Sequence, residues 1–289
     1  MADQYCVVGR DVSQSLSPTM MNAAFKSSEI DARYTAVSVQ EAGFPREFRR
    51  LMTSRFKGMN VTIPFKTAVI PLLAGLDPVA TRIQSVNTVK GDEDGRYLGY
   101  STDPDGILSP LQAIAATLDV RNAMLIGAGG AARAFCEAMN RMGCVDVAVA
   151  VRNVDRAREF VRGMEGAFPR MNLTLASIED LRHLNHDLVF NASPMGSGGE
   201  PLPPELKRVL PGSKIVFDAV YRPRETELLA EAKRNGSVVV HGEEMLLFQG
   251  MAAFKAWTGK EAPEKVMREA LSGSMDGERK KGKGGGSKR

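Results

Sequence analysis

Four polar segments before residue 104 carry side chains that could bind a small acid and move a proton on it. They are residues 13–18, 60–66 and 85–88, the last followed by 101–103. Each lies at the end of a strand-like run, where open α/β sheets bind ligands. The hydroxyls, the amides, Lys66 and Asp103 suit a small polyhydroxylated acid. Because the set contains no His or Cys, we predict no metal site.

Helix capping offers a simpler explanation for two of these residues. Ser17 precedes Pro18, and Asp103 precedes Pro104. Ser or Asp at the N-cap, followed by Pro at the first helical position, is a common helix start. Taken singly, each polar residue has an explanation of this kind, but their co-occurrence is harder to explain by caps.

A glycine-rich turn near the middle of the chain has the pattern of a dinucleotide-binding site. Residues 127–132 fit G-x-G-x-x-A directly after the apolar run 122–126 and before a helical pattern. Gly127 permits the tight turn, Gly129 lets the backbone approach a pyrophosphate, and the helix N-terminus faces the phosphates. The alternative is a glycine-rich turn that binds nothing.

The residues after the next predicted strand favour NADP over NAD. An NAD site usually places Asp or Glu there to hold the ribose 2′-hydroxyl. Here the strand 146–151 is followed by Arg152, Asn153 and Arg156, with no carboxylate at the strand end. A guanidinium group suits the 2′-phosphate of NADP, although two solvated surface arginines are the alternative.

These segments belong to a chain that alternates strand-like and helix-like runs, which predicts an α/β fold with a mostly parallel sheet. A helix is expected over residues 65–73, for example, and another over 131–142 after the glycine turn. A domain boundary is expected near residues 102–104. The helices after His241 could either complete the second domain or cross back to the first.

Composition supports a globular protein. The 289 residues are 43% hydrophobic and 25% charged, and no apolar run approaches the ~18 residues of a transmembrane helix. The first residues lack the pattern of a secretory signal. Cys6, Cys136 and Cys144 are an odd number without CxxC spacing, so we expect no disulfide framework and a cytoplasmic location.

The positive net charge lies at the C-terminus. Of the 38 Lys and Arg and the 34 Asp and Glu, six basic residues and one acidic residue lie within 277–289, so the remainder holds 32 basic and 33 acidic residues. A nearly neutral body argues against nucleic-acid binding, although the tail could act as a nucleic-acid arm. The tail has no apolar residue to bury, so disorder is expected over 276–289.

The chain resembles the shikimate dehydrogenases from about Tyr5 to Leu271. The family's S-x-S-P, N-V-T-x-P-F-K, V-N-T and N-T-D elements correspond to residues 15–18, 60–66, 86–88 and 101–103. Its G-A-G-G-A-x-R and N-R-T-x-x-R elements correspond to residues 127–133 and 151–156. Its N-A-[ST], D-x-x-Y-x-P-x-x-T and G-x-x-M-x-x-x-Q elements correspond to residues 191–193, 218–226 and 242–249. The pair N-V-T-x-P-F-K and G-A-G-G-A at this spacing is highly specific.

The resemblance implies an enzyme that reversibly reduces 3-dehydroshikimate to shikimate with NADPH. It implies a catalytic pair, Lys66 and Asp103, that meets across an interdomain cleft. The implied substrate-binding residues are Ser15, Ser17, Thr62, Asn87, Tyr221 and Gln249. The implied cofactor-binding residues are Gly127, Ala128, Gly129, Gly130, Ala131, Arg152, Asn153, Arg156, Ser193, Gly242 and Met245. A lysine beside a carboxylate can exchange a proton with the substrate oxygen, so we predict that Lys66 is the acid/base and that Asp103 orients it.

The resemblance also implies a domain plan. We expect a substrate-binding α/β domain over residues 1–103 and a Rossmann-type NADP-binding domain over 104–241. Helices over 242–275 would pack on the substrate domain, and 276–289 would form the basic tail. The expected partner is a small-molecule substrate, with neither nucleic acid nor membrane, and the protein is expected to be a monomer or a homodimer.

Several residues depart from the family pattern. Ser101 replaces the usual Asn, Pro104 and Asp105 replace small residues, and Glu243 stands where Leu is usual. These departures keep two alternatives open. One is a quinate or amino-shikimate dehydrogenase-like paralogue, although Ser at position 17 favours shikimate over the larger quinate. The other is a weakly catalytic NADP-binding regulatory protein, against which the intact pair Lys66 and Asp103 argues.

Overall fold

The structure is a computed structural model that describes residues 2–54, 56–115, 119–181 and 186–283. Within these ranges the chain forms two compact units. The first takes its residues from Met1–Asp77, Val86–Thr102 and Gly250–Arg289, and the second from Pro78–Ser85 and Asp103–Gln249. Each unit is built on its own six-stranded sheet.

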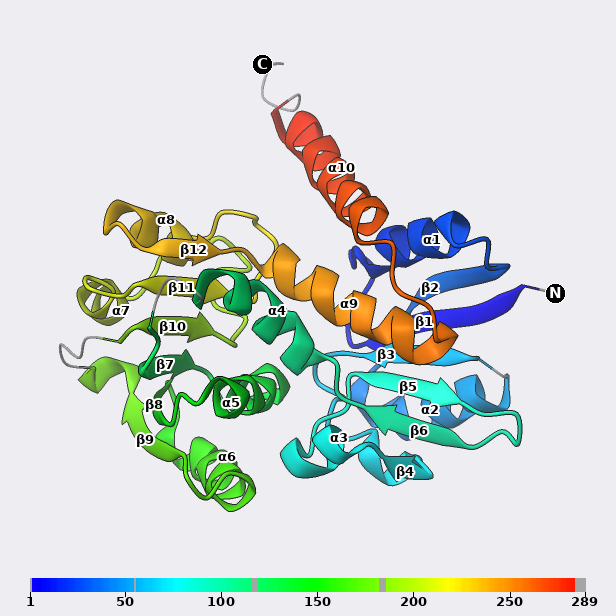
Figure 1. Cartoon of the computed structure of the whole chain (residues 1–289), viewed down its shortest axis with the longest axis horizontal. Helices are drawn as coiled ribbons and strands as arrows, with labels where there is room; N and C mark the ends of the chain where they lie inside the picture. Colours follow the sequence, from blue (N-terminus) through cyan, green and yellow to red (C-terminus); the bar gives the residue numbers. More distant parts are fainter. Residues whose placement is uncertain (1, 55, 116–118, 182–185, 284–289) are drawn as a thin grey trace. The chain divides into compact units, whose positions relative to one another are not determined.

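The sheet of the first unit has the strand order β2-β1-β3-β5-β6-β4 (Figure 1). Its strands are β1 (Asp3–Gly9), β2 (Ala32–Ser38), β3 (Gly58–Val61), β4 (Gly75–Leu76), β5 (Thr88–Gly91) and β6 (Tyr97–Tyr100). β1 is parallel to β2 and β3, whereas β5 is antiparallel to both β3 and β6, and β4 is parallel to β6. Consequently β1, β3 and β6 end at the edge of the sheet where β5 begins.

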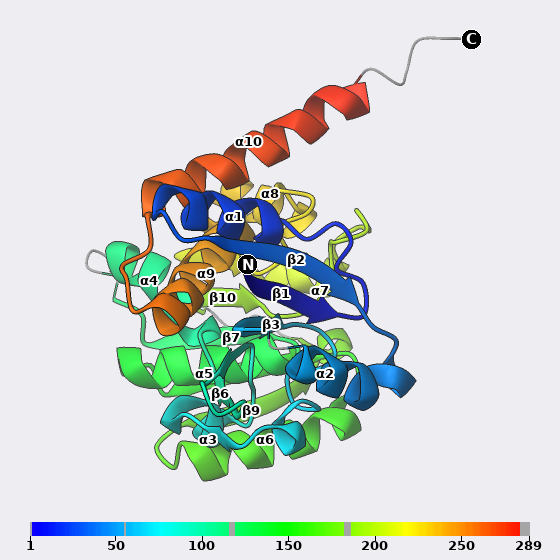
Figure 2. The ribbon, with the colours of Figure 1, turned by 90° about the vertical axis from the view of Figure 1, so that its right-hand side faces the viewer.

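An aromatic cluster ties the C-terminal helices to the first unit's sheet. The helices of this unit are α1 (Ser17–Ser27), α2 (Phe44–Thr53), the last part of α9 (Gly242–Thr258) and α10 (Glu264–Lys283), with the short 3-10 helices η1 (Glu41–Gly43) and η2 (Ile70–Leu72). Trp257 of α9 packs on Tyr5 of β1 and donates its indole N–H to the carbonyl of Val89 at 3.0 Å. A Cβ at Gly58 would lie 2.4 Å from the Trp257 ring, so this glycine makes room for it. Figure 2 shows α10 running beside α1.

The second unit has six parallel strands in the order β12-β11-β10-β7-β8-β9 (Figure 1). They are β7 (Asn122–Ile126), β8 (Asp146–Val151), β9 (Asn172–Ser177), β10 (Leu188–Asn191), β11 (Ile215–Asp218) and β12 (Val238–Val240). The helices are α3 (Pro78–Ile83), α4 (Asp103–Ala115), α5 (Gly130–Met142), α6 (Val154–Ala167), α7 (Pro204–Val209), α8 (Glu227–Arg234) and the first part of α9, with the 3-10 helix η3 (Ile178–Asp180). This is the doubly wound order, in which the direction of winding reverses between β7 and β10.

Side chains that point alternately to the two faces of the sheet explain why helices cover both faces. Leu125 of β7 packs in one buried cluster with residues of α4, α5 and α6, whereas its neighbours Met124 and Ile126 pack in a second cluster with residues of α7 and α8. Successive side chains of a strand point to opposite faces, so a strand that is apolar throughout is buried on both. The predicted fold class, α/β with a Rossmann-type domain, is confirmed.

Two local expectations differ from the structure. Residues 65–73 do not form the predicted helix but a series of turns that ends in η2. Pro71 has no amide hydrogen to donate, and Thr67, Val69 and Ile70 are β-branched, which disfavours a regular helix. At the other end of the chain, α10 continues to Lys283, into the segment for which disorder was expected, because its Glu, Arg and Lys residues are good helix formers. Residues 284–289 lie outside the described part.

None of the helices in the described ranges is long and apolar enough to cross a membrane.

Candidate active site

The topology of the first unit brings the four polar segments together at one sheet edge. They follow β1, β3 and β6 and precede β5, and all four positions lie at the same edge. Hydrogen bonds join three of them: the Val86 amide donates to the carbonyl of Lys66 at 2.8 Å, and the Thr102 amide donates to Oδ1 of Asn87 at 2.7 Å. Five predicted residues therefore share one edge of the first unit: Ser15, Ser17, Thr62, Lys66 and Asn87.

Ser17 does not serve as the predicted helix cap. It is already the first residue of α1, and Leu16, at the cap position, makes no side-chain hydrogen bond to the helix. The Ser15 hydroxyl instead accepts the Ser17 amide at 3.2 Å. The capping explanation of Ser17 is therefore wrong, because the turn before the helix is closed by the neighbouring serine.

Behind this edge lies a buried polar network that joins residues of three of these segments to Tyr34, which the sequence analysis did not single out. The Tyr34 hydroxyl donates to Oδ1 of Asn60 at 2.6 Å, and the Asn60 amide group donates to Oγ1 of Thr88 at 3.0 Å. Oγ1 of Thr88 lies 3.0 Å from Oγ1 of Thr102, which accepts Nδ2 of Asn87 at 2.9 Å. All five side chains are buried. The signal for Tyr34 in the sequence is weak: a tyrosine usually finds a hydrogen-bond partner when buried, but its strand, β2, alternates buried and more exposed residues.

In the second unit, the glycine turn lies where the winding of the sheet reverses. Gly127 follows β7 with φ of +103°, and a Cβ added to it would lie 3.3 Å from Ser193, which follows the neighbouring strand β10. Gly129, at the N-cap of α5, makes no side-chain cap, and the first turn of α5 carries no acidic residue. The first amides of α5 thus have no side-chain cap, whereas Asn153 and Thr226 cap α6 and α8. A pyrophosphate fits this turn.

The loop after β8 presents the two predicted arginines at the neighbouring strand end. Asn153 caps α6 by accepting the backbone amide of Arg156 at 3.0 Å, and Arg152 and Arg156 are exposed. The charge of Arg152 contributes to lowering the pKa of Glu200, after that carboxylate's hydrogen bonds with its own backbone amide and that of Gly196. The donor set therefore fits a nucleotide with a 2′-phosphate.

Asp103 and Gln249 lie on two helices of the second unit that cross at a glycine. Asp103 begins α4, and its carboxylate is buried. A Cβ at Gly106, three residues later, would lie 2.6 Å from the carbonyl of Met245 and 3.0 Å from Cβ of Gln249. Only glycine allows α4 and α9 to approach this closely. The crossing places three predicted residues, Asp103, Met245 and Gln249, near one another, whereas Lys66 belongs to the first unit.

The loop that carries Tyr221 is held between β11 and the start of α9. A Cβ at Gly242 would lie 2.6 Å from the carbonyl oxygens of Ala219 and Val220, so Gly242 packs directly against this loop. Asp218, at the end of β11, accepts the backbone amide of Val220 at 2.9 Å. Tyr221 is half-buried.

Asp218 gives a prediction for the pH dependence of stability. Burial raises its pKa to about 6, although hydrogen bonds from Thr226, Val220 and Asn191 oppose the shift. The folded pKa lies above the ordinary value of 3.8, so the unfolded chain loses this proton first and the free energy of unfolding falls as pH rises from about 4 to about 6. The expected change is of the order of 3 kcal/mol, and it should be lost in Asp218→Asn.

Denaturant unfolding of the wild type and Asp218→Asn at several pH values between 4 and 7 measures this slope. The exposed Asp31, replaced by Asn, is the control and should leave the wild-type slope unchanged. Parallel curves for the wild type and Asp218→Asn would contradict the prediction.

Two of the departures from the family pattern have local partners. Glu243 pairs with Arg224, with nitrogen–oxygen distances of 2.6–3.0 Å, and so links the start of α9 to the Tyr221 loop. Asp105 of α4 lies 3.4 Å from Arg141 of α5. The Ser101 hydroxyl is buried and hydrogen-bonds no other residue in the described ranges. Nothing in the structure explains why Ser stands at this position.

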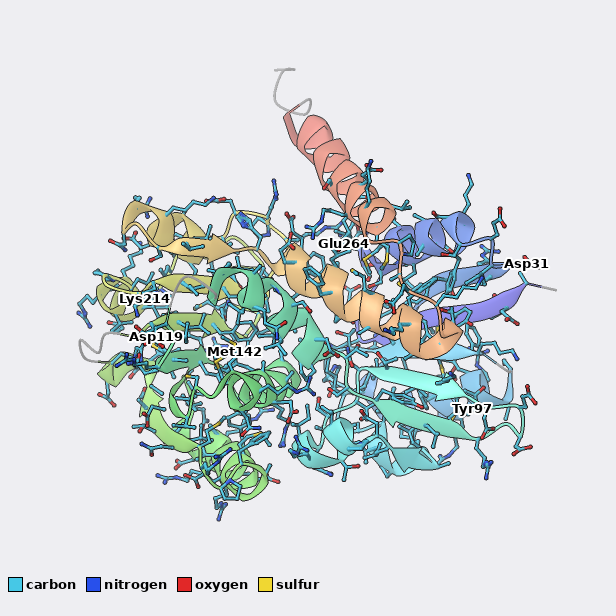
Figure 3. All side chains as sticks on the ribbon, in the orientation of Figure 1. Asp31, Tyr97, Asp119, Met142, Lys214 and Glu264 are labelled. Atoms are coloured by element: carbon cyan, nitrogen blue, oxygen red, sulfur yellow. The ribbon has the colours of Figure 1, made fainter. Side chains whose placement is uncertain are left out.

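At the amino ends of the strands of the second sheet, opposite to the glycine turn, side chains pair with other residues of the same unit. Lys214, just before β11, donates to the carbonyl of Asp119 at 2.7 Å, and both residues are labelled in Figure 3. Lys214 also pairs with Asp187 at 2.8 Å. The amino ends of β7, β10 and β11 are thus tied together, whereas the carboxyl ends carry the glycine turn. Among the described residues, no three His, Cys, Asp or Glu side chains form a group that could hold a metal ion.

A doubly wound unit with an uncapped glycine turn at the point where its winding reverses places this chain in the class of dinucleotide-binding proteins. Three family models match the chain. The shikimate dehydrogenase substrate binding domain matches residues 7–89, shikimate / quinate 5-dehydrogenase matches 110–195, and the shikimate 5'-dehydrogenase C-terminal domain matches 242–271. The chain belongs to the shikimate dehydrogenase family, as its similarity to the following relatives also shows.

Two relatives are named shikimate dehydrogenase (NADP(+)). The one from Moorella thermoacetica is 39% identical over 282 residues, which cover 94% of each chain. The one from Bacillus cereus strain AH187 is 34% identical and covers 96% of this chain and 100% of its own. A solved shikimate dehydrogenase in complex with NADP+ has a TM-score of 0.84 and 29% identity, covering 95% of this chain and 96% of its own.

A second solved structure was determined with both ligands. It is shikimate 5-dehydrogenase from Thermus thermophilus in complex with NADP(H) and shikimate, with a TM-score of 0.80 and 34% identity. The similarity covers 93% of this chain and 98% of that one.

Proposed function

We propose that this protein catalyses the reversible, NADP-dependent reduction of 3-dehydroshikimate to shikimate. The observation that carries the proposal is the convergence of Ser15, Ser17, Thr62, Lys66 and Asn87 on one edge of the first unit's sheet. Hydroxyl and amide groups beside one ammonium group suit a ring that bears hydroxyls and a carboxylate. The similarity to enzymes named for this reaction supports the same substrate.

Each residue has a proposed part in the reaction. Ser15 and Ser17 bind the substrate carboxylate, and Thr62, Asn87, Tyr221 and Gln249 contact the carboxylate or the ring hydroxyls. NADPH, when bound, supplies the hydride. Lys66 donates a proton to the oxygen of the ketone that is reduced and removes it in the reverse direction. Asp103 orients the lysine.

The cofactor is held by the second unit. The backbone amides of residues 127–131 bind the pyrophosphate, and Arg152 and Arg156 bind the 2′-phosphate. Asn153 supports this loop as the cap of α6. Ser193, Gly242 and Met245 border the nicotinamide half of the cofactor. A monomeric or homodimeric state, the lack of nucleic-acid binding and a cytoplasmic location stay predictions from the sequence.

Steady-state rates with shikimate and with quinate, each with NADP+ and with NAD+, test the proposal. The highest kcat/KM is expected for shikimate with NADP+, since Ser17 favours the smaller acid and the arginines favour the phosphorylated nucleotide. A higher kcat/KM for quinate would make the protein a quinate dehydrogenase. Tight NADP+ binding without oxidation of either acid would indicate the regulatory alternative.

A further inference from the structure

Tyr34 is a buried residue whose hydroxyl is linked by hydrogen bonds to residues of the substrate edge. It lies in β2, the edge strand of the first unit's sheet, and is only 2% exposed. Its ring packs on Trp257, and its hydroxyl donates to Oδ1 of Asn60 at 2.6 Å. Burial raises the pKa of Tyr34 well above its ordinary value, and a side-chain hydrogen bond with Ser17 opposes the shift. The neutral phenol is therefore a hydrogen-bond donor to Asn60.

The hydrogen bonds of Asn60 depend on this phenol. The side-chain amide nitrogen donates to the carbonyl of Asn87 at 3.1 Å and to Oγ1 of Thr88 at 3.0 Å. These two bonds use both amide hydrogens, and the Tyr34 hydroxyl donates to the amide oxygen on the other side. Without this donor, the buried amide oxygen of Asn60 would be left without the hydrogen bond from Tyr34. The Asn60 side chain would then shift or rotate to find another partner.

The network continues from Asn60 to the residue before Asp103. Oγ1 of Thr88 contacts Oγ1 of Thr102 at 3.0 Å, and the backbone amide of Thr102 donates to Oδ1 of Asn87 at 2.7 Å. Asn87 is a proposed substrate-binding residue, and Thr102 is the last residue before α4. One continuous chain of hydrogen bonds therefore runs from Tyr34 to two segments of the substrate edge.

We infer that Tyr34 is a positioning residue for shikimate binding, which acts through Asn60 on Asn87 and Thr102. The inference rests on the proposed function. Low polarity around a buried network strengthens each hydrogen bond and makes a missing partner costly. The loss of one hydrogen bond therefore changes the geometry of the other members of the network. The cofactor turn in the second unit is not part of this network.

Replacing Tyr34 by Phe tests the inference, because only the hydroxyl is removed. The KM for shikimate should rise about fivefold to twentyfold, the effect expected when a buried acceptor loses its partner, whereas the KM for NADP+ should not change. Tyr5→Phe is the matched control. Tyr5 is a buried tyrosine of the same aromatic cluster, and its hydroxyl makes no hydrogen bond with another described residue. A general loss of packing would affect both variants.

A double-mutant cycle with Thr102→Val distinguishes coupling through the network from separate losses of stability in the two variants. If Tyr34 and Thr102 act through one network, the combined variant should raise the KM for shikimate by clearly less than the product of the two single effects. Independent losses of stability would multiply instead. Thermal unfolding of each variant sets the assay temperature below its transition.

The outcomes separate this inference from the proposed function. A rise in the KM for shikimate in Tyr34→Phe but not in Tyr5→Phe, together with coupling to Thr102, supports it. If the wild type oxidises shikimate but Tyr34→Phe behaves like Tyr5→Phe, or if the two effects multiply, the inference is overturned and the function stands. If the wild type neither binds nor oxidises shikimate, the proposed function fails and the inference falls with it.

Discussion

Replacing Lys66 by Met should lower kcat for shikimate oxidation by about 10²- to 10⁴-fold, the range that a general acid or base contributes. Lys66 is half-buried in the segment after β3, and Met is an unbranched side chain that fills similar space without the ammonium group. The proton of the reacting hydroxyl would then lose the acceptor that we propose for it. Because the loss concerns the chemical step, the KM for shikimate should change much less than kcat.

The matched control for this experiment lies at the other end of the same strand. Lys57 precedes β3 and is exposed, so Lys57→Met should keep wild-type turnover. Rates of NADPH formation give kcat, and isothermal titration calorimetry with shikimate gives its affinity. Near-normal turnover of Lys66→Met, with shikimate binding undisturbed, would refute the assignment of Lys66 as the acid/base.

The second large effect is expected in the cofactor loop. Replacing Arg152 by Ser should raise the KM for NADP+ about 10- to 100-fold, since a hydrogen bond to a charged group contributes about 1.5–3 kcal/mol. The KM for NAD+ should hardly change, because NAD+ has no 2′-phosphate. The ratio of kcat/KM for the two nucleotides therefore measures the role of Arg152 without depending on overall activity.

Arg158 provides the control for Arg152. It lies on α6 a few residues further along the chain and pairs with Asp155 at 3.1 Å. Arg158→Ser should leave the KM for both nucleotides unchanged. Equal changes for NADP+ and NAD+ in Arg152→Ser would mean that the arginine only supports the loop, and the 2′-phosphate contact would have to be sought at Arg156.

Some parts of the fold follow from local patterns, and others do not. The glycine turn was predictable because Gly127 needs a positive φ and follows an apolar strand, both of which are visible within a few residues. The helix expected over residues 65–73 was wrong, because apolar spacing there reflects burial of Phe65 and Val69 within turns rather than helical periodicity. The capping alternative for Ser17 was wrong because Ser-Pro marks a helix start only to within about one residue.

The sequence by itself determined which reactive and ligand-binding groups are present. They are Lys66 and Asp103 with serines and amides, a glycine turn, and arginines after the following strand. Residue types and short spacings carry that information because they depend on neighbours in the chain. Only the tertiary structure decided that the segments after β1, β3 and β6 meet the start of β5 at one edge, and that Tyr34 lies behind them against Asn60. Strand order and the direction of β5 create these contacts between residues tens of positions apart, and no local pattern specifies them.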